Sequence, residues 1–138
     1  MRALLFATIC CLACTVPDPK LKQYLAEGEQ LYVLHCSNCH QRGGQGLARV
    51  YPPIAHSDYV QKNFDKVICG MKYGMAGELT VNGVAFNQFM PGVITLTELE
   101  LAEIATYIYN SWGNERGLIE VSDIRPLLDS CARPRLRR

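Results

Sequence analysis

Two cysteines separated by two residues and followed directly by a histidine form the segment of this sequence best suited to chemistry, Cys36-Ser37-Asn38-Cys39-His40. Thiols at this spacing can form thioether bonds to the two vinyl groups of a haem, and the adjacent histidine can then bind its iron. The C-x-x-C-H pattern is the attachment signal of c-type haem. A haem held in this way also needs a second axial ligand, an apolar pocket and a compartment where attachment takes place.

Two other kinds of site can contain the pair Cys36 and Cys39. A thioredoxin-like dithiol follows a strand in a βαβ context, whereas the residues before Cys36 have a helical pattern. A structural zinc site needs two further ligands at close spacing, and the sequence has no second C-x-x-C and no H-x-x-x-H. The five residues therefore favour haem attachment and leave both alternatives open.

Pro52 is the candidate acceptor for the second ring N–H of the iron-binding histidine. It lies in the segment Tyr51-Pro52-Pro53-Ile54, where the two prolines restrict the backbone. A rigid carbonyl group there could fix the orientation of the His40 ring. The alternative is that these prolines only shape a surface loop.

Met90 is the candidate for the second axial ligand. A thioether is a soft, weak ligand suited to a six-coordinate electron-transfer iron, and Pro91 directly after Met90 makes the backbone rigid. Met71 and Met75 are rivals, but they lie at a helix end and in a glycine-rich loop without such a proline. His35 and His56 are expected to be solvated rather than to bind iron.

Apolar residues spaced three and four apart predict helices on both sides of the motif. The first begins near Lys20 and leads into the motif, with Gly28 on its apolar face, where a second helix would cross closely. The second spans 58–71 after a Ser57 cap. The third opens at the capping box 97–100 and continues past Trp112 until Gly113 stops it.

Two shorter elements are expected in addition. Asn82-Gly83 between the apolar segments 79–81 and 84–86 predicts a small β-hairpin with a type I′ turn. After Gly113, Ser122 could cap a short helix that continues to about Ala132.

The first residues resemble an export signal. A basic Arg2 precedes an apolar segment, 3–13, that is too short to cross a bilayer. Ala13 before Cys14 resembles a bacterial lipoprotein cleavage site, which predicts Cys14 as an acylated residue. Cys10 and Cys11, whose preceding residues fit less well, compete as the start of the mature chain, and an ordinary cleaved signal without lipid is the other alternative. We therefore divide the chain into a signal peptide (1–13), a tether (14–19), a main domain (20–113) and a C-terminal extension (114–138).

The remaining cysteines and the charge distribution fit an exported protein. Outside the first 14 residues and the motif only Cys69 and Cys131 remain, and an even pair in such a protein suggests a disulfide, with two free thiols as the alternative. The formal net charge is +1, which gives no indication of nucleic-acid binding. The extension ends in a basic tip that could be solvated or contact an acidic partner or anionic lipid; its arginines are Arg133, Arg135, Arg137 and Arg138.

Taken together, these residues resemble a class I cytochrome c, the bacterial monohaem kind, of lipoprotein type. The resemblance covers about 20–113 and rests on the haem motif, on Gly28 with Tyr32 and Tyr107, on Tyr51-Pro52-Pro53-Ile54 and on Phe89-Met90-Pro91-Gly92. It implies an all-α cytochrome c fold, in which three to four main helices surround one covalently attached haem c and its iron. This chain departs from the family in its small β-hairpin insertion around Asn82-Gly83 and in the extension after Gly113 with its short C-terminal helix.

The resemblance also implies a function. We expect an electron carrier rather than an enzyme, on the periplasmic side and held to the membrane by a lipid anchor. Its partners would be an oxidase, a reductase or a quinol-oxidising complex of the respiratory chain. Two alternatives stay open: a haem-based sensor or peroxidase-like protein with a labile distal ligand, and a fixed electron-relay subunit of a respiratory complex.

Overall fold

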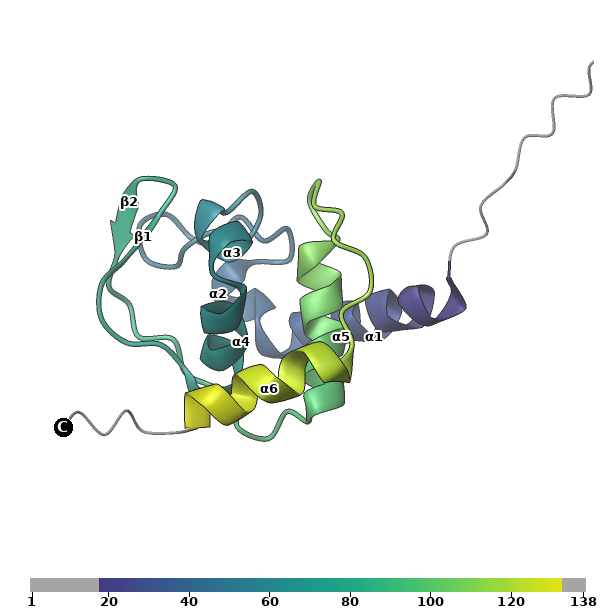
Figure 1. The fold of residues 1–138 in the computed structure, drawn as a ribbon. Helices are drawn as coiled ribbons and strands as arrows, with labels where there is room; N and C mark the ends of the chain where they lie inside the picture. Colours follow the sequence, from purple (N-terminus) through teal and green to yellow (C-terminus); the bar gives the residue numbers. More distant parts are fainter. Residues whose placement is uncertain (1–17, 133–138) are drawn as a thin grey trace, which may run out of the picture.

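The computed structural model describes residues 18–132, which form a mostly helical domain with a small two-stranded antiparallel sheet (Figure 1). The predicted signal peptide, Cys14 and the basic tip lie outside the described residues. No helix within 18–132 is long and apolar enough to cross a membrane.

The first helix, α1 (Pro19–His35), begins where the sequence analysis expects it. Asp18 caps it, because its side chain accepts a hydrogen bond from the backbone N–H of Lys20 at 2.9 Å, and Pro19 occupies the first turn, where its missing N–H costs nothing. A single turn, α2 (Ser37–His40), follows and contains the motif.

Helix α5 (Glu98–Tyr109) crosses α1, as Figure 1 shows, and Gly28 lies at the point of closest approach. A Cβ atom on Gly28 would overlap the backbone carbonyl of Glu103 and lie 2.9 Å from the Cβ of Tyr107. The absent side chain therefore allows the two backbones to approach, as the mid-face glycine predicts. Thr97 and Glu100 form the predicted capping box at the start of α5.

The predicted helix over 58–71 is wrong as one element, because the structure divides it into α3 (Asp58–Lys62) and α4 (Phe64–Tyr73). The break is at Asn63, whose side-chain amide and backbone N–H both donate to the carbonyl of Tyr59, at 2.9 and 3.0 Å. A side chain that competes in this way for a helix carbonyl ends the helix.

The end of α5 also differs from the prediction. The helix stops at Tyr109 rather than near Gly113, so Trp112 lies outside it with a φ of 54°. Asn110 causes the turn: its side-chain amide donates to the carbonyls of Thr106 and Gly117, at 2.7 and 2.8 Å, and its oxygen accepts the Gly117 N–H at 2.7 Å.

The hairpin β1 (Leu79–Val81) and β2 (Val84–Phe86) agrees with the prediction, with Val81 opposite Val84 and positive φ angles at Asn82 and Gly83. Val81 and Phe86 are buried on one face, which also carries the half-buried Leu79 and Val84, while Thr80 and Ala85 face solvent. The hairpin therefore contributes one apolar face to the interior.

The extension packs on the domain through α6 (Val121–Ala132), which contacts α4 and α5 (Figure 1). Ile119, Ile124 and Leu128 are buried in the same core as α1 and α5. Ser122 is not the cap, because the helix already begins at Val121; the side chain of Asp123 instead accepts the Glu120 N–H at 2.8 Å.

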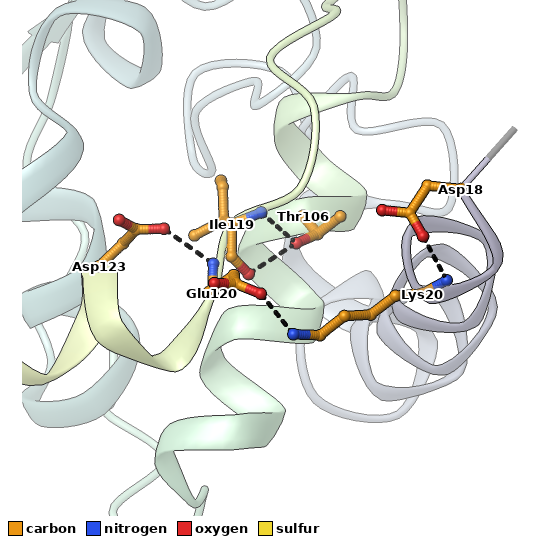
Figure 2. A network of polar contacts seen from close by, with 6 residues as sticks. All are labelled: Asp18, Lys20, Thr106, Ile119, Glu120 and Asp123. Atoms are coloured by element: carbon orange, nitrogen blue, oxygen red, sulfur yellow. Dashed lines mark hydrogen bonds and ion pairs between the residues drawn. The ribbon is translucent and has the colours of Figure 1, made fainter.

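Polar contacts connect the extension to two helices (Figure 2). The buried hydroxyl group of Thr106 accepts the Ile119 N–H at 3.1 Å and donates to the Ile119 carbonyl at 3.2 Å. The ammonium group of Lys20 pairs with Glu120. In addition, Cys69 on α4 and Cys131 on α6 form a disulfide with their Cα atoms 5.8 Å apart.

Candidate haem-binding site

The end of α1 places the three motif side chains along one cavity. Cys36 closes the helix by donating its backbone N–H to the Tyr32 carbonyl at 2.8 Å, and Ser37 donates its hydroxyl group to the Val33 carbonyl at 2.7 Å. The short helix α2 then turns Cys39 and His40 back towards the interior. Cys36, Cys39 and His40 all line the same cavity.

His40 has a fixed orientation. Its Nδ1 atom lies 2.9 Å from the carbonyl oxygen of Pro52, and because a carbonyl can only accept, Nδ1 must carry the proton. Burial lowers the pKa of His40, and the hydrogen bond to Pro52 offsets part of that effect. The ring is therefore neutral near pH 7, and its Nε2 lone pair is left free to bind a metal.

The loop after His40 is shaped by glycine contacts that bring Pro52 into place. A Cβ atom on Gly46 would overlap the Tyr51 carbonyl and lie 2.8 Å from the Pro52 carbonyl oxygen, and the Gly46 N–H donates to the His40 carbonyl at 2.9 Å. Trp112 packs over Gly44, where a Cβ atom would lie 2.8 Å from its ring. Sequence reasoning placed Trp112 on a helix face and so missed this contact.

Apolar side chains from four elements make up most of the cavity wall. The motif occupies one part of it, and α3, α4, the hairpin and α5 supply much of the remainder, together with the loop segments 51–54 and 88–91. These apolar residues include Val60, Val67, Leu79, Val81, Phe86, Ile104 and Ile108. The cavity is thus suited to a large, flat, mostly apolar group.

Met90 also lines this cavity, and the end of α4 braces its segment. Its backbone N–H and carbonyl pair with those of Met75, at 3.0 and 2.9 Å. Two residues later, Gly92 fits closely against Gly74, where a Cβ atom would overlap the backbone, and the Val93 N–H donates to the Met71 carbonyl at 2.9 Å. The bracing therefore comes from tertiary contacts as well as from Pro91.

Lys72 adds a brace that sequence reasoning missed. Its ammonium group donates to the carbonyl oxygens of Ile94 and Leu96, at 2.5 and 2.6 Å. The side chain thus connects the last turn of α4 to the segment that follows Met90. Nothing in the local sequence marks Lys72 for this contact, because its acceptors lie more than twenty positions away.

The rival sites suggested by the two cysteines fit less well. Burial raises the pKa of the Cys36 thiol to about 12, whereas a reactive dithiol needs a lowered pKa. Within residues 18–132, no group of three or more Cys, His, Asp or Glu side chains is arranged to hold a metal ion. A redox dithiol and a zinc site are therefore both disfavoured.

Two thiols, a neutral histidine with a free Nε2 and methionine thioethers around an apolar cavity fit the requirements of a covalently bound haem. The comparison with known proteins agrees: the cytochrome c family model matches residues 25–112. The chain belongs to the cytochrome c family. Membership implies a covalently bound haem c with its iron.

Among similar proteins, cytochrome c-552 of Thermus thermophilus is 30% identical over 95 residues, which cover 66% of this chain and 72% of that protein. The cytochrome c subunit of the quinone alcohol dehydrogenase of Komagataeibacter europaeus is 30% identical over 126 residues, covering 83% of this chain but 26% of that subunit. The fructose dehydrogenase cytochrome subunit of Gluconobacter japonicus is 25% identical over 103 residues, or 21% of its length. The chain thus spans about a quarter or less of these two dehydrogenase subunits.

Proposed function

We propose that this protein is an exported c-type cytochrome that carries single electrons between partners of a respiratory chain and is not itself an enzyme. Cys36 and Cys39 would hold the haem through thioether bonds, and His40 and Met90 would bind its iron. The observation that carries the proposal is the shared cavity: these four side chains line it together, with His40 oriented by Pro52.

When bound, haem c supplies one-electron exchange at its iron. The residues of this chain control that exchange. His40 offers a neutral imidazole nitrogen, and the Pro52 carbonyl keeps its ring from rotating. Met90 offers a soft sulfur, which raises the potential relative to ligation by His alone. With His40 and Met90 both bound to it, the iron would have no free position for a small molecule.

The apolar cavity wall would influence the reduction potential of the haem. Burial in a low-dielectric cavity disfavours extra charge at the metal and excludes water from the ligands. Tyr32, one of the polar side chains of the wall, donates its hydroxyl group to the Gln41 carbonyl at 2.7 Å, and burial raises its pKa. It therefore stays protonated and adds no charge near neutral pH.

The second candidate function is that of a fixed electron-relay subunit in a larger complex, and the names of several similar proteins give a reason to consider it. Several similar proteins are named as cytochrome subunits of dehydrogenases, and this chain resembles only a part of each. In such an assembly the haem would still relay electrons, but the protein would remain bound to its partner. Isolation of a stable monomer after removal of lipid would exclude this candidate.

We further propose that the protein works on the periplasmic side of the membrane. The export signal motivates this, and acylation of Cys14 would hold the protein to the membrane by a lipid anchor. Attachment of c-type haem also takes place outside the cytoplasm, so an export signal and a haem motif are mutually consistent.

The central test combines a pyridine haemochrome spectrum with the intact mass of protein purified from membranes. The expected result is one haem with thioether linkage and a mass that includes acyl chains on Cys14. The ferric protein should also show the weak sulfur-to-iron charge-transfer band at the red end of the spectrum. A missing band at neutral pH, together with rapid binding of carbon monoxide, would overturn the carrier assignment.

A matched variant pair tests the attachment residues. Cys36→Ala with Cys39→Ala should leave little folded protein, because the haem fills the cavity that the core surrounds. Cys69→Ala with Cys131→Ala, which leaves the motif intact, should still attach haem. A stable haem-free fold from the first pair would contradict the proposal.

A further inference from the structure

Met75 is placed almost equivalently to Met90, and the proposed function gives it no role. The two residues are directly opposed in an isolated antiparallel bridge, in which each backbone N–H donates to the carbonyl of the other, at 2.9 and 3.0 Å. Directly opposed residues in antiparallel strands place their side chains on the same face, with Cβ atoms about 5 Å apart. Accordingly, both methionines line the haem cavity.

The thioether of Met75 lies in the cavity wall, where it packs against the backbone of α4 at Gly70. A Cβ atom on Gly70 of α4 would lie 2.6 Å from the sulfur and 2.7 Å from the Cγ of Met75. Glycine at this position therefore makes the room that the sulfur occupies. The side chain is half-buried, and it is not a member of the hydrophobic core cluster.

Met71 differs from Met75 although it lines the same cavity. It is on α4, only 6% exposed, and it belongs to the core cluster with Ile68 and Leu101. Moving its sulfur would open a hole in the core. Met75 follows Gly74, beyond the helix, and its side chain has three rotatable bonds.

We propose that Met75 is a reserve distal ligand, which binds the haem iron when the Met90 thioether is lost. This inference rests on the proposed His40/Met90 ligation. The two sulfurs have the same chemistry, so the exchange breaks one sulfur–iron bond and forms another, with no electron or proton transferred. One way to lose the first thioether is its oxidation by hydrogen peroxide, which transfers one oxygen atom to the sulfur to give the sulfoxide and leaves as water.

The test compares single and double variants of the haem-loaded protein. Leucine replaces methionine in each, because it removes the sulfur while nearly conserving volume, so that the fold is retained. The readouts are the sulfur-to-iron band of the ferric protein and the rate at which the ferrous protein binds carbon monoxide. Circular dichroism verifies that each variant keeps its helices.

We expect Met90→Leu to keep a sulfur-to-iron band, and Met75→Leu to keep the band of the original protein. The double variant Met75→Leu/Met90→Leu should lose the band. The double variant should also bind carbon monoxide at least about tenfold faster than Met90→Leu. A Met75 sulfur that occupies the iron of Met90→Leu for about nine-tenths of the time leaves only about a tenth of the iron open to carbon monoxide, whereas the double variant has no such sulfur. The control Met71→Leu/Met90→Leu should behave like Met90→Leu.

Several outcomes would overturn the proposal. If Met90→Leu and the Met75→Leu/Met90→Leu variant both lack the band and bind carbon monoxide equally fast, Met75 is not a reserve ligand, although the proposed function stands. Loss of the band in Met75→Leu, with retention in Met90→Leu, would make Met75 the primary ligand and correct the proposed function itself. If Met71→Leu/Met90→Leu loses the band while Met75→Leu/Met90→Leu keeps it, the reserve ligand is Met71.

Discussion

Asp58 and Asn82 hydrogen-bond each other twice, through the backbone N–H of each and the side-chain oxygen of the other. The N–H of Asp58 lies 3.0 Å from Asn82 Oδ1, and the N–H of Asn82 lies 2.7 Å from Asp58 Oδ1. The Asn82 amide also donates to the His56 carbonyl at 3.2 Å. These contacts connect the tip of the hairpin, whose Val81 and Phe86 line the cavity, to the start of α3.

Removing the Asn82 side chain should loosen the hairpin. Asn82→Gly retains the positive φ that the turn requires, and the backbone N–H of residue 82 can still donate to Asp58. The expected loss is therefore that of the two side-chain contacts, to the Asp58 N–H and to the His56 carbonyl. We predict faster amide hydrogen exchange across 79–86 and a thermal midpoint lowered by a few degrees. Thr80→Ala, on the solvent face of β1, is the control; equal exchange in the two variants would contradict the prediction.

The hydrogen bonds between Asp58 and Asn82 predict that the stability of the fold depends on pH. The hydrogen bond from the Asn82 N–H lowers the pKa of Asp58 below its ordinary value. Because the folded-state pKa lies below that of the unfolded chain, the carboxylate stabilises the fold above about pH 4, and this contribution is lost as the pH falls through the folded value.

Asp58→Asn keeps an acceptor oxygen but cannot titrate. The thermal midpoint of the original protein should therefore fall more steeply than that of Asp58→Asn between about pH 5 and about pH 3. Asp65→Asn, at an exposed position on α4, should follow the original protein. Parallel curves for all three proteins would show that the pairing of Asp58 with Asn82 does not affect acid stability.

The crossing of α1 and α5 should not tolerate a side chain at residue 28. Gly28→Ala places a Cβ atom against the Glu103 carbonyl and the Cβ of Tyr107, and both are fixed in α5. Overpacking of this kind costs about 1–3 kcal/mol or more, whereas Ala favours a helix over Gly by about 1 kcal/mol. Denaturant unfolding should show a net loss, and Glu29→Ala, on the exposed side of α1, should not.

The disulfide should stabilise the domain by constraining the unfolded chain. It closes a loop with a sequence separation of 62 between Cys69 and Cys131, and loss of such a bond typically costs about 2–4 kcal/mol. Cys69→Ala with Cys131→Ala should lower the unfolding free energy by this amount and increase hydrogen exchange in α6. An unchanged denaturation midpoint would exclude a stabilising role.

The contribution of Thr106 to holding the extension should come from its hydroxyl group and not from the packing of its methyl group. Thr106→Val has nearly the same shape but leaves the buried backbone N–H and carbonyl of Ile119 without this partner. The expected loss of stability is about 1–3 kcal/mol, measured by denaturant unfolding. Thr106→Ser keeps the hydroxyl group and should lose less; equal losses would attribute the effect to packing.

Short-range patterns in the sequence determined the family and most of the helical elements. The haem motif, the capping box at Thr97 and the Asn82-Gly83 turn each depend on residues within a few positions, because hydrogen bonds of caps and turns close locally. The first helix was predictable for the same reason, and Gly28 indicated the crossing because close backbone approach needs a missing side chain. These features could be derived without knowing the path of the chain.

Only the tertiary structure decided how the site is assembled. That Cys36, His40 and Met90 line one cavity depends on the crossing of α1 and α5 and on the return of the chain along α4. The bridge from Met75 to Met90 and the brace from Lys72 join residues far apart in the sequence. Such contacts leave no local periodicity, because their partners are chosen by packing and not by spacing. The reserve position of Met75 is therefore visible only in the folded chain.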